Sequence, residues 1–203
     1  MNNEEKILKE MQKNNGMITT NDVEQMGIAR KTLTRMLEKG LIERKSQGLY
    51  VLPNSWGDEY YNIIFSSKNA VFSHATALFL HGLSERVPLI YEITVINGYN
   101  ASLKTKENVE LYSVTKDIFE LGRIEIESPQ GKIVPVYDIE RTLCDMLKSK
   151  QNQDIEIIKY AFTTYVKSPK KDIYKLMKYA KKLKVDEEIN TYLEVLLWWI
   201  LKV

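Results

Sequence analysis

Four side chains suited to nucleic-acid binding lie close together between residues 30 and 35 of this 203-residue chain: Arg30, Lys31, Thr34 and Arg35. Cationic side chains neutralise backbone phosphates, and Arg or Thr can also hydrogen-bond to base edges. Successive helical residues are about 100° apart, so a helix over residues 30–39 gathers these four side chains on one face. Its opposite face carries Leu33, Met36 and Leu37. The spacing predicts an amphipathic helix that presents a basic, hydroxyl-bearing face to DNA.

A basic hairpin follows this helix. Residues 41–45 and 48–52 are expected to form two strands around a Ser46-Gln47-Gly48 turn, because short β-rich runs flank a Gly turn signal. Arg44, Lys45 and Gln47 then lie near the hairpin tip, where they can contact the DNA backbone or the minor groove. Glu38 falls on the basic side of the helix and would repel phosphate unless it pairs with a nearby arginine.

The preceding residues supply the elements that position this helix. Residues 3–14 carry apolar side chains at helical spacing, and Thr19 or Thr20 can cap a second helix that ends near Gly27. Helix, turn, basic helix and hairpin in this order are typical of a winged helix-turn-helix, which docks its second helix in the major groove. Two alternatives remain open for this module: its charges are simply solvated, or it contacts protein instead of DNA.

Candidate catalytic and metal-binding residues are few. His74 and His81 are seven residues apart, about 10 Å along a helix axis, so they are too distant to form a metal-binding pair. Glu125 and Glu127 share one face of an expected strand, with Lys132 following, as in metal-dependent nucleases. Such a site needs carboxylates that converge from adjacent strands. No phosphate loop, nucleophile elbow or Cys/His cluster is present. We therefore expect no catalytic residues, no metal and no cofactor, and a protein that is not an enzyme.

The overall composition, 44% hydrophobic and 28% charged, is that of an ordinary globular protein. The single cysteine, Cys144, excludes an internal disulfide and favours a reducing compartment. The start of the chain lacks an apolar signal-peptide core, and the apolar run 195–201 is shorter than the roughly 20 residues of a membrane-spanning helix. The sequence predicts a cytoplasmic protein with no membrane association.

The remaining residues predict an α+β fold with two domains: a winged helix-turn-helix over 1–56, and a larger C-terminal domain over 57–203 that combines a small mixed sheet with several packed helices. Strands are expected over 91–96, 109–114, 123–127 and 132–137, and helices over 58–65, 74–81, 139–148, 154–166, 169–184 and 187–201. Ser73 and Asp138 are expected to be N-caps, and His81 to lie against its own helix end. Arg141 and Asp145, four residues apart, are expected to form a surface ion pair.

Charge is unevenly distributed along the chain. The net charge is +2, but residues 148–184 contain 11 basic and 3 acidic side chains, whereas residues 58–147 contain 8 basic and 13 acidic ones. A solvated helix face and a second nucleic-acid surface both remain open for the basic region, whose candidate residues are Lys167, Lys170, Lys171, Lys175, Lys178 and Lys182. The apolar tail 193–201 is expected to be buried core, with a partner-binding surface as the alternative.

Three segments in a fixed order resemble one known family. They are GLIERKSQGLYVL in the winged module, FSHATALFLHGLSERVP after it, and VYDIERTLCDML further on. Together they resemble the AbiEi antitoxins of bacterial abortive-infection systems, over about residues 18–147. Ser73-His74 and Asp138-x-x-Arg141 match hallmark segments of that family.

The resemblance implies a type IV antitoxin that acts in phage defence. Such a protein would repress its own operon by binding inverted repeats in promoter DNA through the N-terminal domain. Its C-terminal domain would counteract a nucleotidyltransferase-like toxin without forming a stable complex with it. By position, the DNA-reading role falls on Arg30, Lys31, Thr34, Arg35, Arg44 and Lys45. The competing hypothesis is a winged-helix transcriptional regulator with a ligand-sensing C-terminal domain and no toxin partner.

Overall fold

The computed structural model describes residues 1–55, 57–65, 67, 69–99 and 108–200, and for residues 197–200 it describes only the backbone. Packing divides the chain into unit 1, formed by Met1–Lys68 and Glu127–Val134, and unit 2, formed by Asn69–Ile126 and Pro135–Val203. Helices and two separate sheets make up the described chain, so the prediction of an α+β fold with a winged module and a larger C-terminal part is confirmed.

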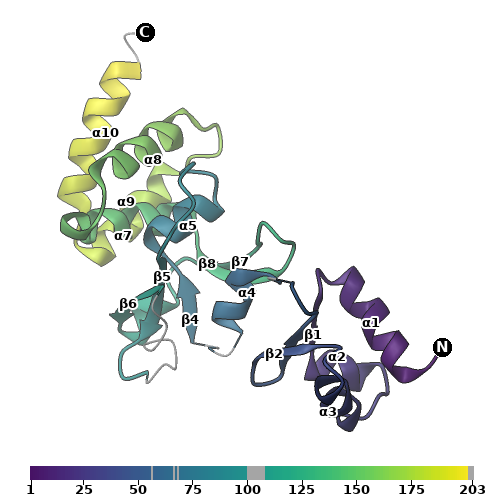
Figure 1. Cartoon of the computed structure of the whole chain (residues 1–203). Coiled ribbons are helices and arrows are strands. Elements are labelled where there is room, and N and C mark those ends of the chain that lie inside the picture. The colour runs from purple at the N-terminus through teal and green to yellow at the C-terminus, as the bar shows by residue number, and fades with distance from the viewer. Residues whose placement is uncertain (56, 66, 68, 100–107, 201–203) are drawn as a thin grey trace. The chain divides into compact units, whose positions relative to one another are not determined.

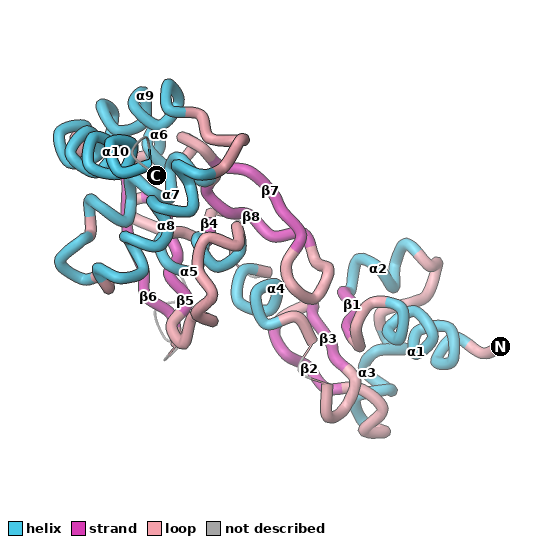
Figure 2. The backbone as a smooth tube through the Cα atoms, turned by 90° about the horizontal axis from the view of Figure 1, so that it is seen from above, coloured by secondary structure: helices cyan, strands magenta, loops and turns pink. Residues whose placement is uncertain are grey.

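Unit 1 contains a three-stranded antiparallel sheet with strand order β1-β3-β2. Its elements are α1 (Asn3–Lys13), β1 (Met17–Thr19), α2 (Thr20–Gln25), α3 (Lys31–Glu38), β2 (Glu43–Ser46), β3 (Leu49–Val51) and α4 (Glu59–Ile64). Figures 1 and 2 show α1, α2 and α3 grouped beside this sheet. The order of elements is that of a winged helix-turn-helix, with β2 and β3 as the wing.

Caps and an apolar cluster hold the three helices in place. Asn2 and Thr19 each form a capping box at the start of α1 and α2, so free N–H groups of the first turn are satisfied. Ile7, Met11 and Met36 are fully buried and belong to one cluster of apolar side chains contributed by α1, α2, α3 and β1. This cluster fixes the orientation of α3, whose polar face is left exposed.

A segment distant in the sequence completes unit 1. The turn after β7 contributes Ser128, whose hydroxyl donates to the buried Asp58 carboxylate at the start of α4. The Gln130 carbonyl accepts a hydrogen bond from the Asn15 side chain, and Lys132 Nζ lies 5.7 Å from the centre of the Tyr61 ring. Residues 127–134 therefore pack as part of the winged module although more than 60 residues separate them from α4.

Unit 2 is built on a five-stranded mixed sheet of order β6-β5-β4-β8-β7. The strands are β4 (Ala70–Phe72), β5 (Tyr91–Ile96), β6 (Val109–Val114), β7 (Arg123–Glu127) and β8 (Ile133–Tyr137). β5 runs antiparallel to β4 and parallel to β6, and β4 runs parallel to β8. The central strand β4 was not predicted, because three apolar residues next to a helix are too short to show the alternation of a strand.

Helices of unit 2 pack into a second layer. They are α5 (His74–Leu80), α6 (Lys116–Phe119), α7 (Ile139–Lys148), the 3-10 turn η2 (Lys150–Asn152), α8 (Ile155–Lys167), α9 (Ile173–Leu183) and α10 (Asp186–Ile200). Fully buried side chains such as Leu143, Phe162 and Leu176 join α7, α8 and α9 in one core. Of the apolar tail 193–201, Leu193 is buried in this core but Val195 is 63% exposed. The side chains after Leu196 lie outside the described residues.

Candidate nucleic-acid interface

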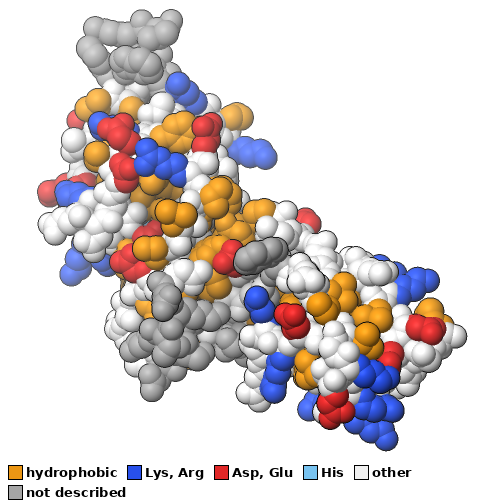
Figure 3. Space-filling view, viewed as in Figure 1, with side chains coloured by type: hydrophobic (Ala, Val, Ile, Leu, Met, Phe, Trp, Pro, Cys, Tyr) orange, Lys and Arg blue, Asp and Glu red, His pale blue; other side chains and the backbone are white. Residues whose placement is uncertain are grey.

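The exposed face of α3 carries three of the four predicted DNA-reading residues of this region: Lys31, Thr34 and Arg35. They are exposed because Thr32, Leu33 and Met36 occupy the buried side of the same helix. Neither Lys31 nor Arg35 forms an ion pair within the described part of the chain. Their cationic groups are thus available to an external polyanion. Figure 3 shows Lys and Arg side chains gathered over the part of unit 1 that contains α3.

Arg30, the fourth residue, is the N-cap of α3. Its Nη2 lies 3.0 Å from Glu24 Oε2 on α2, and its Nε also donates to that carboxylate. The hydrogen bond from Arg30 lowers the pKa of Glu24, so the pair stays charged at neutral pH. Because both side chains are exposed, this pair joins α2 to α3 weakly and leaves Arg30 able to exchange Glu24 for a phosphate.

Glu38 is also exposed, at the C-terminal end of α3, and has no partner among the described residues. The position of Glu38 on the helix allowed an ion pair with Arg35 or Arg30, but neither pair forms among the described residues. A free carboxylate at that end repels phosphate, so the first turns of α3 are better suited to a groove than its last turn.

The wing presents the second predicted set of residues. Arg44, Lys45 and Gln47 are all exposed on β2 and the turn after it. The pairing of β2 with β3 shifts between Arg44 and Ser46, so Lys45 occupies a bulge. A bulge bends its strand and re-aims the extra side chain. The Arg44 guanidinium makes a long contact to the Ser46 carbonyl, 3.4 Å from Nε, whereas Lys45 makes no ion pair in the described residues.

The candidate lysines of unit 2 do not form one uniform surface. Lys167, Lys170, Lys171, Lys178 and Lys182 are exposed at the end of α8, in the loop after it and on α9. Lys175 instead lies between two buried carboxylates, with Nζ 3.1 Å from Asp138 Oδ2 and 3.0 Å from Glu140 Oε2. Burial works to lower the pKa of Lys175, but its hydrogen bonds to Glu140 and Asp138 outweigh burial and raise it. Lys175 therefore stabilises the fold, and only its neighbours are exposed enough to contact nucleic acid.

The structure does not assemble the nuclease-type site that was considered as an alternative. Glu125 and Glu127 are both exposed on β7, an edge strand of the sheet. Across the residues that are described, no group of three or more His, Cys, Asp or Glu side chains is placed to hold a metal ion. Across the same residues, no helix is long and apolar enough to span a bilayer.

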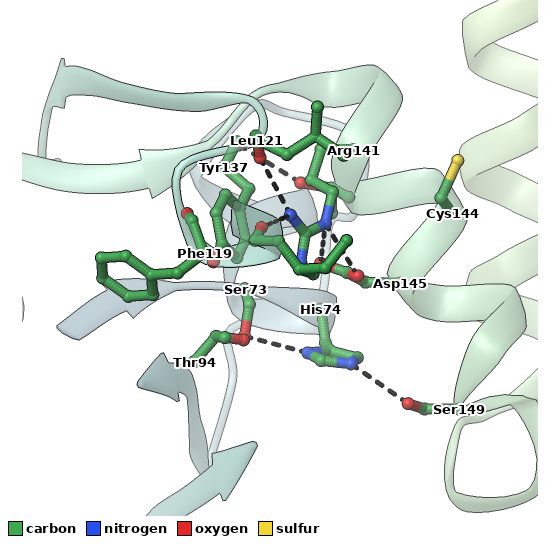
Figure 4. A network of polar contacts seen from close by, with 12 residues as sticks. Ser73, His74, Thr94, Phe119, Leu121, Tyr137, Arg141, Cys144, Asp145 and Ser149 are labelled. Carbon is green, nitrogen blue, oxygen red and sulfur yellow. Dashed lines mark hydrogen bonds and ion pairs between the residues drawn. The ribbon is translucent and has the colours of Figure 1, made fainter. Parts of the chain in front are cut away.

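The predicted ion pair of Arg141 and Asp145 is present (Figure 4), but its predicted surface location is wrong, because both side chains are buried. Arg141 Nε lies 2.9 Å from Asp145 Oδ1, and its Nη1 donates to the carbonyls of Ile118 and Leu121 at 2.5 and 2.9 Å. The spacing of four residues was read correctly. The sequence did not indicate that the segment around α6 covers this pair, because α6 itself was not predicted as an element.

Gly122 allows this segment to approach Arg141. Its φ is +74°, and a Cβ on it would lie 2.8 Å from Arg141 Cβ, closer than two carbon atoms can pack. The Gly122 carbonyl accepts a hydrogen bond from the Asp138 N–H at 2.7 Å. Asp138 also caps α7, as predicted, by accepting from the Arg141 N–H.

Ser73 and His81 differ from their expected roles. Ser73 holds the N-cap position of α5 but makes no capping hydrogen bond, since its hydroxyl contacts His74 Nδ1 and accepts from Thr94. His81 does not act on its own helix end, because its Nε2 lies 2.7 Å from the Tyr137 carbonyl on β8. His74 is buried, with φ +49° and its Nε2 3.2 Å from Ser149 Oγ. These three residues are structural links between α5, the sheet and α7.

Comparison with known proteins supports the reading of the winged module. Residues 5–53 match the family model described as "Transcriptional regulator, AbiEi antitoxin". No curated protein is significantly similar to the chain. Among solved structures, the RV2827C protein from Mycobacterium tuberculosis is similar with a TM-score of 0.57 and 10% identity, over 86% of this chain and 70% of that one. At that identity the likeness shows the fold alone. The resemblance to AbiEi antitoxins is thus confirmed at the N-terminus, and the α3 face and the wing both lie within the segment that matches this family model.

Proposed function

We propose that this protein is an antitoxin that binds operator DNA and represses its own operon. The observation that carries the proposal is the exposed basic face of α3 beside a basic wing, both within the part of the chain that matches the AbiEi regulator family. In this binding mode the N-terminal half of α3 enters the major groove, and Arg44 and Lys45 contact the flanking backbone.

The roles of individual residues follow from their chemistry. Arg35 and Thr34 are placed on α3 to hydrogen-bond to base edges. Lys31, at the first turn, is suited to a phosphate, as is Lys45 in the bulge of the wing. Arg30 joins this set when DNA phosphate replaces Glu24. Inverted repeats in the promoter would be read by two copies of the chain, one on each half-site.

For unit 2 we propose the toxin-counteracting role that the family resemblance implies. Its partner is a nucleotidyltransferase-like toxin encoded next to it, which it would neutralise without a stable complex, in abortive infection against phage. The protein would act in the cytoplasm, where both the operator and the toxin are found. Among the described residues, the buried Arg141 network and the contacts of Lys175 give the Asp138-x-x-Arg141 segment a structural role.

A gel-shift assay on the promoter of the gene tests the DNA-binding part of the proposal. The double variant Lys31→Ala/Arg35→Ala should lose binding to the inverted repeats, while Lys6→Ala, which removes an exposed lysine of α1, should bind as the unchanged protein does. Co-expression with the adjacent gene product measures toxin neutralisation separately. Operator binding that is unchanged in the double variant would rule out α3 as the reading helix.

A further inference from the structure

Unit 2 contains a cavity of about 590 Å³ that no role described above uses. It lies between the C-terminal ends of α7 and α9, the turn η2, the start of α10 and strand β6. The residues that give it its character are Tyr112, Lys148, Ser149, Lys150, Lys184 and Glu188. Small-molecule sites commonly have volumes of roughly 300 to 1,000 Å³, so this cavity has the size of a metabolite site. We call it the α7–α9 cavity.

Three exposed lysines from two stretches of the chain, residues 148–150 and residue 184, line the α7–α9 cavity. Lys148 ends α7, Lys150 begins η2 and Lys184 follows α9. Among the lining residues that the structure describes, Glu188 is the sole carboxylate, and it pairs with Lys150, whose Nζ lies 3.7 Å from its Oε1. Within the described residues neither Lys148 nor Lys184 has an ion-pair partner. Two uncompensated cations in a concave site attract an anion more strongly than the same charges on a flat surface.

Lys184 occupies a backbone conformation that a glycine adopts more easily. It ends α9 with φ 60° and ψ 47°, the left-handed conformation in which most helices of this kind carry Gly. A side chain with a Cβ is strained there. Strained residues of this type cluster at functional sites, where a particular side chain has to reach a particular place. Here the strained residue is a lysine, and its side chain lines the cavity.

Tyr112 and Ser149 add uncharged polar side chains to the lining of the cavity. The Tyr112 ring stacks on His74 with a centroid separation of 3.7 Å, and its hydroxyl donates to Glu92 at 2.9 Å. Ser149 Oγ contacts His74 Nε2. Burial lowers the pKa of His74 to about 4, so the imidazole is neutral at physiological pH. Tyr112 and Ser149 contribute hydroxyl groups to the lining, and the lysines contribute the charge.

We propose that the α7–α9 cavity binds a small molecule that carries a phosphate group, with the phosphate held by Lys148 and Lys184. Lysine binds phosphate as a flexible point charge, and two lysines from different helices can contact different oxygens of one group. Lys150 remains with Glu188 and completes the rim. The site does not depend on DNA binding by unit 1, so it stands or falls separately from the proposed function.

Titration of the full-length protein with inorganic phosphate, AMP and ATP tests the proposal, with calorimetry for affinity and thermal unfolding for stability. Two variants remove the proposed contacts, Lys148→Gln and Lys184→Gly. The second is informative because glycine relieves the left-handed strain, so the fold should be at least as stable while the cation is lost. Lys181→Gln is the matched control, since it removes an exposed lysine of α9 that does not line the cavity.

We expect saturable binding of at least one of the three probes, and a raised unfolding temperature in its presence. Lys148→Gln and Lys184→Gly should each weaken binding about tenfold, the effect of losing one charge-assisted hydrogen bond, while Lys181→Gln leaves binding unchanged. Saturation by inorganic phosphate as tight as by the nucleotides identifies free phosphate as sufficient, and saturation by AMP or ATP alone assigns the site to nucleotides. The proposal is overturned if no probe saturates, or if the control weakens binding as much as the two variants.

Discussion

Arg141 and Asp145 form an ion pair that is closed to water, with the arginine Nε 2.9 and 3.0 Å from the two carboxylate oxygens. The guanidinium carbon also lies 4.1 Å from the centre of the Tyr137 ring. Through its Nη1 the same side chain holds the carbonyls at the end of α6. One buried cation therefore joins α7, β8 and the segment that precedes β7.

Replacing Arg141 by methionine should lower the free energy of unfolding by about 3–5 kcal/mol, because the Asp145 carboxylate is left buried without its partner. Urea unfolding of the full-length protein measures this. Arg86→Met is the control, since the Arg86–Asp154 pair is exposed and its loss should cost less than about 1 kcal/mol. The double variant Arg141→Met/Asp145→Leu should recover part of the loss. A cost for Arg141→Met no larger than that for Arg86→Met would contradict the structural role.

Acid should destabilise the protein through His74. Burial lowers its pKa from 6.5 to about 4, and the charges of Arg141 and Lys148 act in the same direction against that of Glu92. Between these two pH values the unfolded chain binds a proton that the native state does not, so the free energy of unfolding falls as pH falls, by up to about 3 kcal/mol. Above pH 6.5 His74 is neutral in both the native and the unfolded state, so no free energy of unfolding is lost through this residue.

The variant His74→Asn removes the titrating group and suits the positive φ, which Asn tolerates better than most residues. Urea unfolding at several pH values between 7.5 and 4 should give a shallower pH dependence for the variant than for the unchanged protein. Because the pKa of His81 is also lowered by burial, the comparison rests on the difference between the two profiles. Parallel profiles would show that His74 does not titrate in this range.

Substitutions in the wing and in α3 should change DNA binding in different ways. Lys45→Ala should weaken binding about equally on operator and unrelated DNA and reduce the salt dependence by about one phosphate contact. Arg35→Ala should weaken operator binding more than binding to unrelated DNA, by about 1–3 kcal/mol, because in the proposed binding mode Arg35 hydrogen-bonds to base edges. Fluorescence anisotropy at several salt concentrations separates the two. Identical losses on both DNAs for Arg35→Ala would place it on the backbone instead.

A separate experiment tests whether the exposed lysines of unit 2 contact nucleic acid. Charge reversal at Lys170, Lys171 and Lys178 leaves the structural Lys175 intact, so the fold should be retained. If these lysines contact nucleic acid, as we predict, affinity for long operator fragments should fall and the salt dependence should become shallower. Reversal at Lys167 is avoided because that side chain has an interaction of its own. Unchanged binding together with unchanged toxin neutralisation would identify the lysines as a solvated face.

Ser128 should matter for the stability of the winged module. Its hydroxyl donates to the buried Asp58 carboxylate and accepts from the Lys132 N–H at 3.1 Å. Ser128→Ala leaves that carboxylate with one fewer donor and should cost about 1–3 kcal/mol. Ser113→Ala, at an exposed position of β6, is the control. Hydrogen exchange can localise the effect, and unchanged protection of α4 and β1 in Ser128→Ala would show that the contact is dispensable.

The winged module was predictable because its signals are local. A basic face on α3, a cap at Thr19 and a glycine turn in the wing each depend on residues within about ten positions of one another. Burial of Arg141 was not predictable in the same way, since the segment that covers it is more than 15 residues away in the sequence and α6 is a single turn. Strand β4 was not predicted because three residues are too few to show the two-residue alternation of a strand. The α7–α9 cavity was not predicted because its lysines come from two stretches more than 30 residues apart, and spacing within one stretch does not indicate it.

Unit 1 needs residues 127–134 as well as its first 68. A ribosome adds roughly 5–20 residues per second from the N-terminus, so α1, α2, α3 and the wing emerge several seconds before the turn that carries Ser128. Until that turn arrives, the Asp58 carboxylate lacks one of the donors that it has in the finished molecule. The DNA-binding module thus reaches its final form only after about two-thirds of the 203 residues have been made. A nascent or prematurely ended chain would carry α3 and the wing without this support, so the finished winged module is tied to synthesis of most of the protein.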